Sequence, residues 1–212
     1  MIDLTRRDGG VLRIGHRGAA LLAPENTLRS FREAVAYGVD LVEFDVLDLP
    51  GGPLVLAHSD RLEEVSHGAA SGPVRGRSLA ELRELAPELP TLDEALEFFV
   101  AEAPEVGLHV DLKLTTRLDE LAEALRRRGL ERRTVVSSFH VPSLHAVARE
   151  APAIRSRNPS SPTTCRSAFA KAETLPAGTS RPASGGTVSG IAPEVVPITG
   201  RPCATASAYA MP

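Results

Sequence analysis

Residues 11–58 decide the fold, and they read VLRIGHRGAALLAPENTLRSFREAVAYGVDLVEFDVLDLPGGPLVLAH. Side chains two residues apart in a strand share a face, so Glu43 and Asp45 project together while Phe44 projects the other way. Two carboxylates on one face of an apolar strand are costly unless something positive lies between them. A divalent cation is the simplest such group, since hard cations prefer carboxylate oxygens. An edge strand with a solvated face would show the same pattern.

The segment GLHVDLKL at residues 107–114 repeats this pattern, because leucines and a valine alternate with His109, Asp111 and Lys113. Apolar stripes of helical period separate the strand-like runs, which predicts parallel strands with helical crossovers. The interpretation is an α/β fold, a TIM-type (β/α) barrel whose chemistry lies at the carboxyl ends of its strands. We expect strands at 11–15, 40–46, 54–57, 107–114 and 133–138, a fifth barrel strand beginning within 152–155, and helices at 27–37, 79–85, from Thr91 or Asp93 to 100, at 117–128 and at 141–150.

Residues 11–155 resemble the glycerophosphodiester phosphodiesterase family, and the motifs follow one another in the family's order. A single HRG motif would be weak evidence for the family, but the whole series of motifs at this spacing is specific to it. The resemblance covers the first half of the family's domain, because a full barrel needs about 250 residues and only the first four to five βα units, roughly, are found. The motifs are HRG at 16–18, PENT at 24–27, EFDV at 43–46, His58 after a short strand, DLK at 111–113 and SSF at 137–139.

The resemblance implies metal-dependent hydrolysis of glycerophosphodiesters to glycerol 3-phosphate and an alcohol. A glycerol hydroxyl would attack its own phosphate, and water would then open the cyclic intermediate. One divalent metal, Mg²⁺ or Ca²⁺, would assist this phosphoric diester hydrolase of lipid and glycerol metabolism. The implied roles are acid–base catalysis for His16 and His58, phosphate binding for Arg17 and Lys113, support for Glu25 and Asn26, and metal binding for Glu43, Asp45 and Asp111.

Some of these residues have simpler interpretations. Asn26 can cap the following helix, as can Thr27, and Lys113 can be a plain ion-pair partner of Asp111. His109 faces the same way as Asp111 but has no counterpart in the family.

The chain also departs from the family in three places. Asp111 stands where the family usually has Glu, which keeps the ligand type but shortens its reach. Ser59 replaces an Asp that often follows the second histidine, so an orienting partner of His58 is lost unless Asp60 replaces it. The family's tryptophan motif on a late strand has no counterpart, because the chain contains no Trp.

The composition changes near residue 155, which divides the chain into a domain at 1–155 and a segment at 156–212. The segment holds two of the 27 acidic residues and one leucine, while Pro, Gly, Ser and Thr make up 28 of its residues. Such a composition does not bury enough apolar surface to offset the entropy of ordering. We predict a low-complexity tail, either disordered or translated out of frame, and we favour the frame change because the break falls within the barrel.

Net charge and apolar patterning exclude several classes of protein. The formal charge of −3 gives no basic footprint for nucleic acid and no polybasic membrane patch. No apolar run approaches 18 residues, so no stable membrane insertion is expected. The first ten residues, MIDLTRRDGG, have no apolar core of a signal peptide, which predicts a cytoplasmic protein. Cys165 and Cys203 suggest neither a disulfide framework nor a metal cluster.

Two other functions fit the same motifs. One is a phospholipase-D-like relative acting on a lysolipid. An active-site mouth with exposed Leu or Phe side chains would favour this function. Residues 59–90 would shape that mouth, and they read as a polar, irregular loop. The other is a non-catalytic, truncated remnant, because half a barrel leaves strand edges unpaired.

Overall fold

One parallel sheet organises residues 12–158, the part of the chain that this computed structural model describes. Its strand order is β1-β2-β4-β5-β6, all neighbours are parallel, and β3 pairs with β2 in the antiparallel sense. The predicted α/β alternation is confirmed, and β6 starts where a fifth barrel strand was expected. The strands are β1 (Ile14–Gly15), β2 (Leu41–Asp48), β3 (Leu54–Leu56), β4 (Gly107–Leu112), β5 (Thr134–Ser137) and β6 (Arg155–Arg157).

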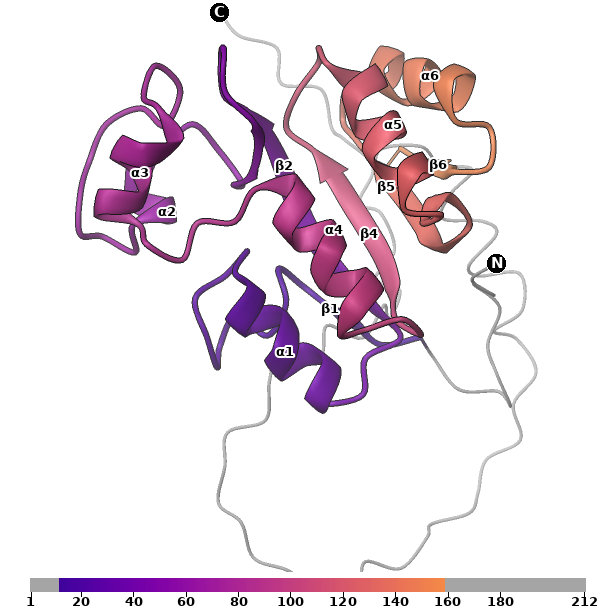
Figure 1. Cartoon of the computed structure of the whole chain (residues 1–212), viewed down its shortest axis with the longest axis horizontal. Helices are drawn as coiled ribbons and strands as arrows, with labels where there is room; N and C mark the ends of the chain where they lie inside the picture. Colours follow the sequence, from indigo (N-terminus) through magenta and orange to yellow (C-terminus); the bar gives the residue numbers. More distant parts are fainter. Residues whose placement is uncertain (1–11, 159–212) are drawn as a thin grey trace, which may run out of the picture.

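Four helices lie along this sheet, and two short ones form a separate lobe beside it (Figure 1). Each predicted helix is found, with ends shifted by about one residue at most. Thr27, Ser78 and Thr91 begin their helices by accepting a hydrogen bond from the third following N–H, which satisfies an otherwise unpaired donor. The helices are α1 (Leu28–Ala36), α2 (Leu62–Val65), α3 (Leu79–Leu85), α4 (Leu92–Ala101), α5 (Leu118–Arg127) and α6 (Val141–Glu150), with one 3₁₀ turn, η1 (Glu131–Arg133).

The main core lies between the four sheet helices and one face of the sheet. Val42, Phe44 and Val46 of β2 are fully buried there. Phe44 stacks on Phe99 of α4, with ring centroids 5.7 Å apart, and packs against Phe31 of α1 at 5.5 Å. Full burial of each such side chain stabilises the fold by about 2 kcal/mol. Since alternate residues of β2 point away from this core, the opposite face of the strand carries Glu43 and Asp45.

Strands β1 and β3 share one edge of β2 and run toward each other. Val46 pairs with Leu56 of β3 and also with Leu112 of β4, so these two strands flank opposite edges of β2. Leu41 pairs in the same way with both Ile14 of β1 and Gly107 of β4. The carboxyl ends of β1 and β3 therefore point toward each other, and both lie beside the middle of β2.

Residues 59–90 are more ordered than the largely irregular, polar segment that we expected, in which only the helix at 79–85 was predicted. They contain α2 and α3 and close a second apolar core against the end of β2 and against β3. The apolar residues of this core lie far apart on short helices and loops, so the sequence shows no helical or strand period there. Its buried members are Leu47, Leu49, Val55, Ala57, Leu62, Val74, Leu82, Ala86 and Leu89.

Within residues 12–158, no helix has both the length and the apolar character needed to cross a bilayer. The predicted tail at 156–212 lies outside the described residues, apart from its first three positions. Strand β6 crosses the predicted boundary at residue 155.

Candidate active site

Three carboxylates predicted to bind a metal come together on the polar face of the sheet. Asp45 and Asp111 are direct neighbours in the register of β2 and β4. Glu43 lies two residues before Asp45, on the same face of β2. One oxygen of each carboxylate lies within 4.8 Å of the others. Burial, and then the charge of Asp45, raise the pKa of Glu43 to about 8. The three groups offer hard oxygen ligands, and their mutual repulsion favours a cation among them.

Lys113 lies directly against this cluster. Its Nζ is 2.6 Å from Asp111 Oδ2 and 3.2 Å from Asp45 Oδ1. Burial disfavours the charged amine, but the hydrogen bond to Asp111 and the charges of both aspartates outweigh it and raise the pKa of Lys113. The ion pair with Asp111 that we considered is present, and Lys113 bridges both aspartates instead of binding one.

The loop between β1 and α1 brings Arg17 to the same place. Its backbone N–H donates to Glu43 Oε2 at 2.9 Å, and its guanidinium binds Glu25 Oε1 at 2.8 Å. The buried Nε lies 3.2 Å from Asp45 Oδ2 but lacks the alignment of a hydrogen bond. Arg17 thus neutralises the cluster from the side opposite the β4 residues.

Two residues of this loop adopt left-handed backbone conformations, Arg17 at a φ of 52° and Asn26 at 57°. Asn26 does not cap α1, because Thr27 does. Its side-chain amide instead donates to Asp45 Oδ2, and its side-chain oxygen accepts from the Asp45 N–H. The predicted supporting role of Asn26 is therefore favoured over the simpler capping role.

The two histidines enter the site from opposite ends of one edge of β2. His16 follows β1 directly, and its Nε2 lies 3.9 Å from Glu43 Oε2. Its side chain is 61% exposed. Partial burial and the charge of Arg17 lower the pKa of His16, which favours a neutral ring at pH 7. His58 follows β3, and a charged His58 ring would lower the pKa of His16 further.

Two sets of contacts in the site escaped sequence reasoning. His58 Nδ1 lies 3.1 Å from Glu64 Oε2, and Ser59 Oγ donates to the same oxygen at 2.9 Å. Asp60, considered as the partner of His58, accepts instead from the Arg75 N–H at 2.6 Å. No spacing signal points to Glu64, because its position depends on the one-turn helix α2.

The second set extends the site to β5. Ser137 is the register neighbour of Asp111, and its Oγ donates to Asp111 Oδ1 at 2.7 Å. Burial lowers the pKa of His109 to about 4, so its ring is neutral at pH 7. Since the Ser137 proton is directed to Asp111, His109 Nε2, 2.9 Å away, donates to Ser137 Oγ. The SSF motif contained this serine, but only the register of β4 and β5 shows its contact.

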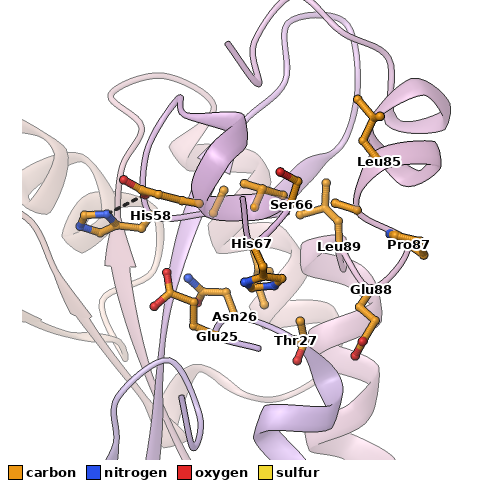
Figure 2. A pocket seen from close by; sticks show the side chains of 15 residues that line it. Glu25, Asn26, Thr27, His58, Ser66, His67, Leu85, Pro87, Glu88 and Leu89 are labelled. Carbon is orange, nitrogen blue, oxygen red and sulfur yellow. Dashed lines mark hydrogen bonds and ion pairs between the residues drawn. The ribbon is translucent and has the colours of Figure 1, made fainter. Parts of the chain in front are cut away.

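A pocket of about 90 Å³ opens beside His58, between the β1–α1 loop and the lobe of α2 and α3. Figure 2 shows Glu25, Asn26 and His58 at its polar end and Leu85, Pro87 and Leu89 at its far end. Glu88 also lines the far end, so polar and apolar side chains both occur there.

Comparison with known proteins agrees with these features. The chain is 29% identical to the glycerophosphodiester phosphodiesterase of Caldanaerobacter subterraneus subsp. tengcongensis, covering 67% of this chain and 63% of that protein. It superposes on the glycerophosphodiester phosphodiesterase of Agrobacterium tumefaciens with a TM-score of 0.59 and 27% identity, covering 69% of this chain and 66% of that one. An Oleispira antarctica phosphodiesterase, solved with the product sn-glycerol-3-phosphate, gives a TM-score of 0.59 at 28% identity, with 74% and 71% covered.

The chain thus spans about 63% of the length of this curated relative. The profile of the "Glycerophosphoryl diester phosphodiesterase family" matches residues 16–177, which includes each candidate site residue. The match runs past residue 155, where our sequence resemblance stopped. With a TIM-type arrangement of strands and helices and a family match over most of its length, this chain belongs to the glycerophosphoryl diester phosphodiesterase family.

Proposed function

We propose that this chain hydrolyses glycerophosphodiesters to glycerol 3-phosphate and an alcohol with the help of one divalent metal, Mg²⁺ or Ca²⁺. The observation that carries the proposal is the triad of Glu43, Asp45 and Asp111, with His16 and His58 entering from opposite ends of the same strand edge. The bound glycerol 3-phosphate in the Oleispira relative supports a small-molecule substrate of this class.

The chemistry of the donor set fits a divalent metal. Glu43, Asp45 and Asp111 would hold the ion through carboxylate oxygens, the ligands that Mg²⁺ and Ca²⁺ prefer. A pKa near 8 for Glu43 shows how strongly the buried site disfavours a third negative charge when no added cation is present. When bound, the ion would supply positive charge against the phosphate oxygens.

Arg17 and Lys113 would bind the phosphate. Both already lie against the carboxylates, with Lys113 between the two aspartates and Arg17 next to Glu25 and Asp45. The planar guanidinium suits two phosphate oxygens at once, whereas the amine acts as a point charge. Glu25 and Asn26 would fix the positions of Arg17 and Asp45.

His16 and His58 would carry the protons. One ring accepts the proton of the attacking glycerol hydroxyl while the other donates a proton to the departing alkoxide. When water opens the cyclic phosphate, the two roles are exchanged. Their approach from opposite ends of the β2 edge suits attacking and leaving groups on opposite sides of a phosphate.

A second candidate is hydrolysis of a lysolipid, which a specific observation favours. Large exposed apolar side chains occur on the loops after β1 and β5, at the start of α6 and at the end of α3. Leu21 is 62% exposed and Phe139 is 71% exposed, and Leu22, Leu85 and Val141 are also exposed. These segments follow the carboxyl ends of strands or border the pocket, where an acyl chain would lie.

The deciding experiment measures glycerol 3-phosphate release from glycerophosphocholine and glycerophosphoethanolamine with added Mg²⁺ or Ca²⁺. We expect metal-dependent release that His16→Ala abolishes. A parallel assay measures choline release from lysophosphatidylcholine, which the second candidate predicts to be faster. A folded sample without activity on any of these substrates would support a non-catalytic remnant and contradict the proposal.

A further inference from the structure

We propose that Glu64 is a positioning residue for His58 that fixes the proton of the ring on Nδ1 and leaves Nε2 to act on the substrate. The inference rests on the proposed function for its catalytic consequence, but not for the contact itself. Neither the motif series nor the family resemblance assigns a role to Glu64.

The contact dictates one tautomer of His58. An ionised carboxylate only accepts hydrogen bonds, so a ring nitrogen 3.1 Å from Glu64 Oε2 must carry the proton. Burial disfavours ionisation of Glu64, but hydrogen bonds from Ser59 and His58 outweigh it and lower its pKa. Glu64 is therefore ionised at pH 7. The dashed line at His58 in Figure 2 marks this contact.

The lobe beside the sheet holds Glu64 in place. Leu62, two residues earlier on α2, is fully buried in the second apolar core, and its N–H donates to the Gly72 carbonyl at 2.8 Å. Ser59 Oγ donates to the same carboxylate oxygen that faces His58. Arg61 lies 3.9 Å from the other oxygen. Because its backbone is anchored and both of its oxygens have partners, the Glu64 carboxylate is held in place independently of His58. It can therefore orient the His58 ring.

The remaining ring nitrogen faces no partner of its own. Among residues 12–158, His58 makes its hydrogen bond through Nδ1, and Nε2 makes none. A neutral ring protonated at Nδ1 has its lone pair on Nε2 and accepts a proton there, while a protonated ring donates from the same atom. Glu64 thus makes one atom of His58 serve in both directions of proton transfer.

The first test is nitrogen-15 NMR of the histidine rings in the full chain at about pH 8, where an ordinary imidazole is neutral. We expect His58 to be protonated at Nδ1, whereas free histidine favours the proton on Nε2. In Glu64→Gln, the amide can donate or accept and no longer requires a proton on Nδ1, so the tautomer population should shift toward the Nε2 form that free histidine favours. A wild-type His58 protonated mainly at Nε2 would overturn the proposal without any variant.

The second test separates positioning from folding. Glu64→Gln should lower kcat on glycerophosphocholine by about tenfold to a hundredfold, the usual effect of losing a carboxylate that orients a functional histidine, with KM and the metal-induced rise in Tm unchanged. Glu63→Gln on the same helix is the matched control and should behave as wild type. A Glu64→Gln variant with wild-type kcat would also overturn the proposal. If the wild type releases no glycerol 3-phosphate, the proposed function fails while the NMR result still decides the role of Glu64.

Discussion

Asn26 and Asp45 hold each other through two hydrogen bonds, one to the side chain and one to the backbone. The Asn26 amide donates to Asp45 Oδ2 at 3.0 Å, and the Asp45 N–H donates to the Asn26 side-chain oxygen at 3.1 Å. Both residues are nearly fully buried. The pair joins the β1–α1 loop to the middle of β2, so the position of Arg17 and that of the carboxylate cluster depend on it.

Replacement of Asn26 should therefore destabilise the protein and weaken its response to metal. Asn26→Ala leaves the Asp45 N–H and one carboxylate oxygen without their partner, which costs about 1–3 kcal/mol. It also places alanine at a φ of 57°, which adds about 1–2 kcal/mol. Urea unfolding measures the sum. Asn26→Gly is the control, because glycine accepts this φ, and it should recover the second contribution but not the first. Equal stability of both variants would contradict this division.

The raised pKa of Glu43 predicts an unusual pH dependence of stability in the metal-free protein. Its pKa is 4.5 in the unfolded chain and about 8 in the folded one. Between these values the folded state holds a proton that the unfolded state has lost, so the free energy of unfolding falls as pH rises from about 4.5 to about 8. Glu43→Gln keeps an acceptor for the Arg17 N–H and should flatten this slope.

Unfolding curves with and without Mg²⁺ or Ca²⁺ check this prediction. A metal that binds the deprotonated carboxylate should raise Tm of the wild type most at about pH 8, and Glu43→Gln should lose most of that rise. Glu33→Gln on the exposed side of α1 is the control and should keep the wild-type slope. The same slope in Glu43→Gln as in the wild type would show that another group titrates.

Gly18 of the HRG motif should tolerate no side chain. A Cβ there would lie 2.3 Å from Ser30 Oγ, and the residue has a φ of 86°. Alanine at this left-handed φ should cost about 1–2 kcal/mol of stability. Its Cβ should also push the loop away from α1. Gly51→Ala is the matched control, since Gly51 has a φ of 73° and a Cβ there would meet nothing within 4 Å. Thermal unfolding should show a larger loss of Tm for Gly18→Ala than for Gly51→Ala, and equal losses would refute the steric argument.

The two faces of each strand could be predicted from sequence, because the alternation of apolar and polar residues is visible within the strand itself. The apolar residues on either side of Glu43 and Asp45 showed which face these carboxylates share. The starts of two helices were placed at Asn26 or Thr27 and at Thr91 or Asp93, and the structure selects Thr27 and Thr91. Contacts between strands were different. Ser137 touches Asp111 only because β4 and β5 pair in one particular register, and no residue of either strand states that register by itself.

In the lobe at residues 59–90, helix α3 was predicted, but α2 and the apolar core were missed for a related reason. Its apolar residues, such as Leu62, Val74 and Leu82, lie far apart on short helices and loops, so they show no period. They form a core only with Leu47 and Leu49 from the end of β2. Glu64 depends on this packing in turn, because buried Leu62 sets the position of α2. The partner of His58 therefore follows from tertiary structure and not from a motif.

Arg75 joins that lobe to the site, and its loss should separate the two. Its guanidinium binds Asp48 Oδ1 at 2.6 Å and the Lys113 carbonyl at 3.3 Å, while its N–H donates to Asp60. In Arg75→Ala the lobe loses its ionic link to the carboxyl ends of β2 and β4, and Lys113 loses a contact that holds its backbone.

We therefore expect Arg75→Ala to speed proteolytic cleavage within residues 66–77 and to lower glycerol 3-phosphate release, with a smaller effect on Tm. Arg77→Ala is the control, because Arg77 hydrogen-bonds to the Pro73 carbonyl inside the same segment and does not bridge to the sheet. An ion pair to the end of β2 and a hydrogen bond to the residue after β4 restrain a loop more than a contact within the loop does, so the two variants should differ in cleavage rate. Equal cleavage rates for both variants would show that the second apolar core alone holds the lobe in place.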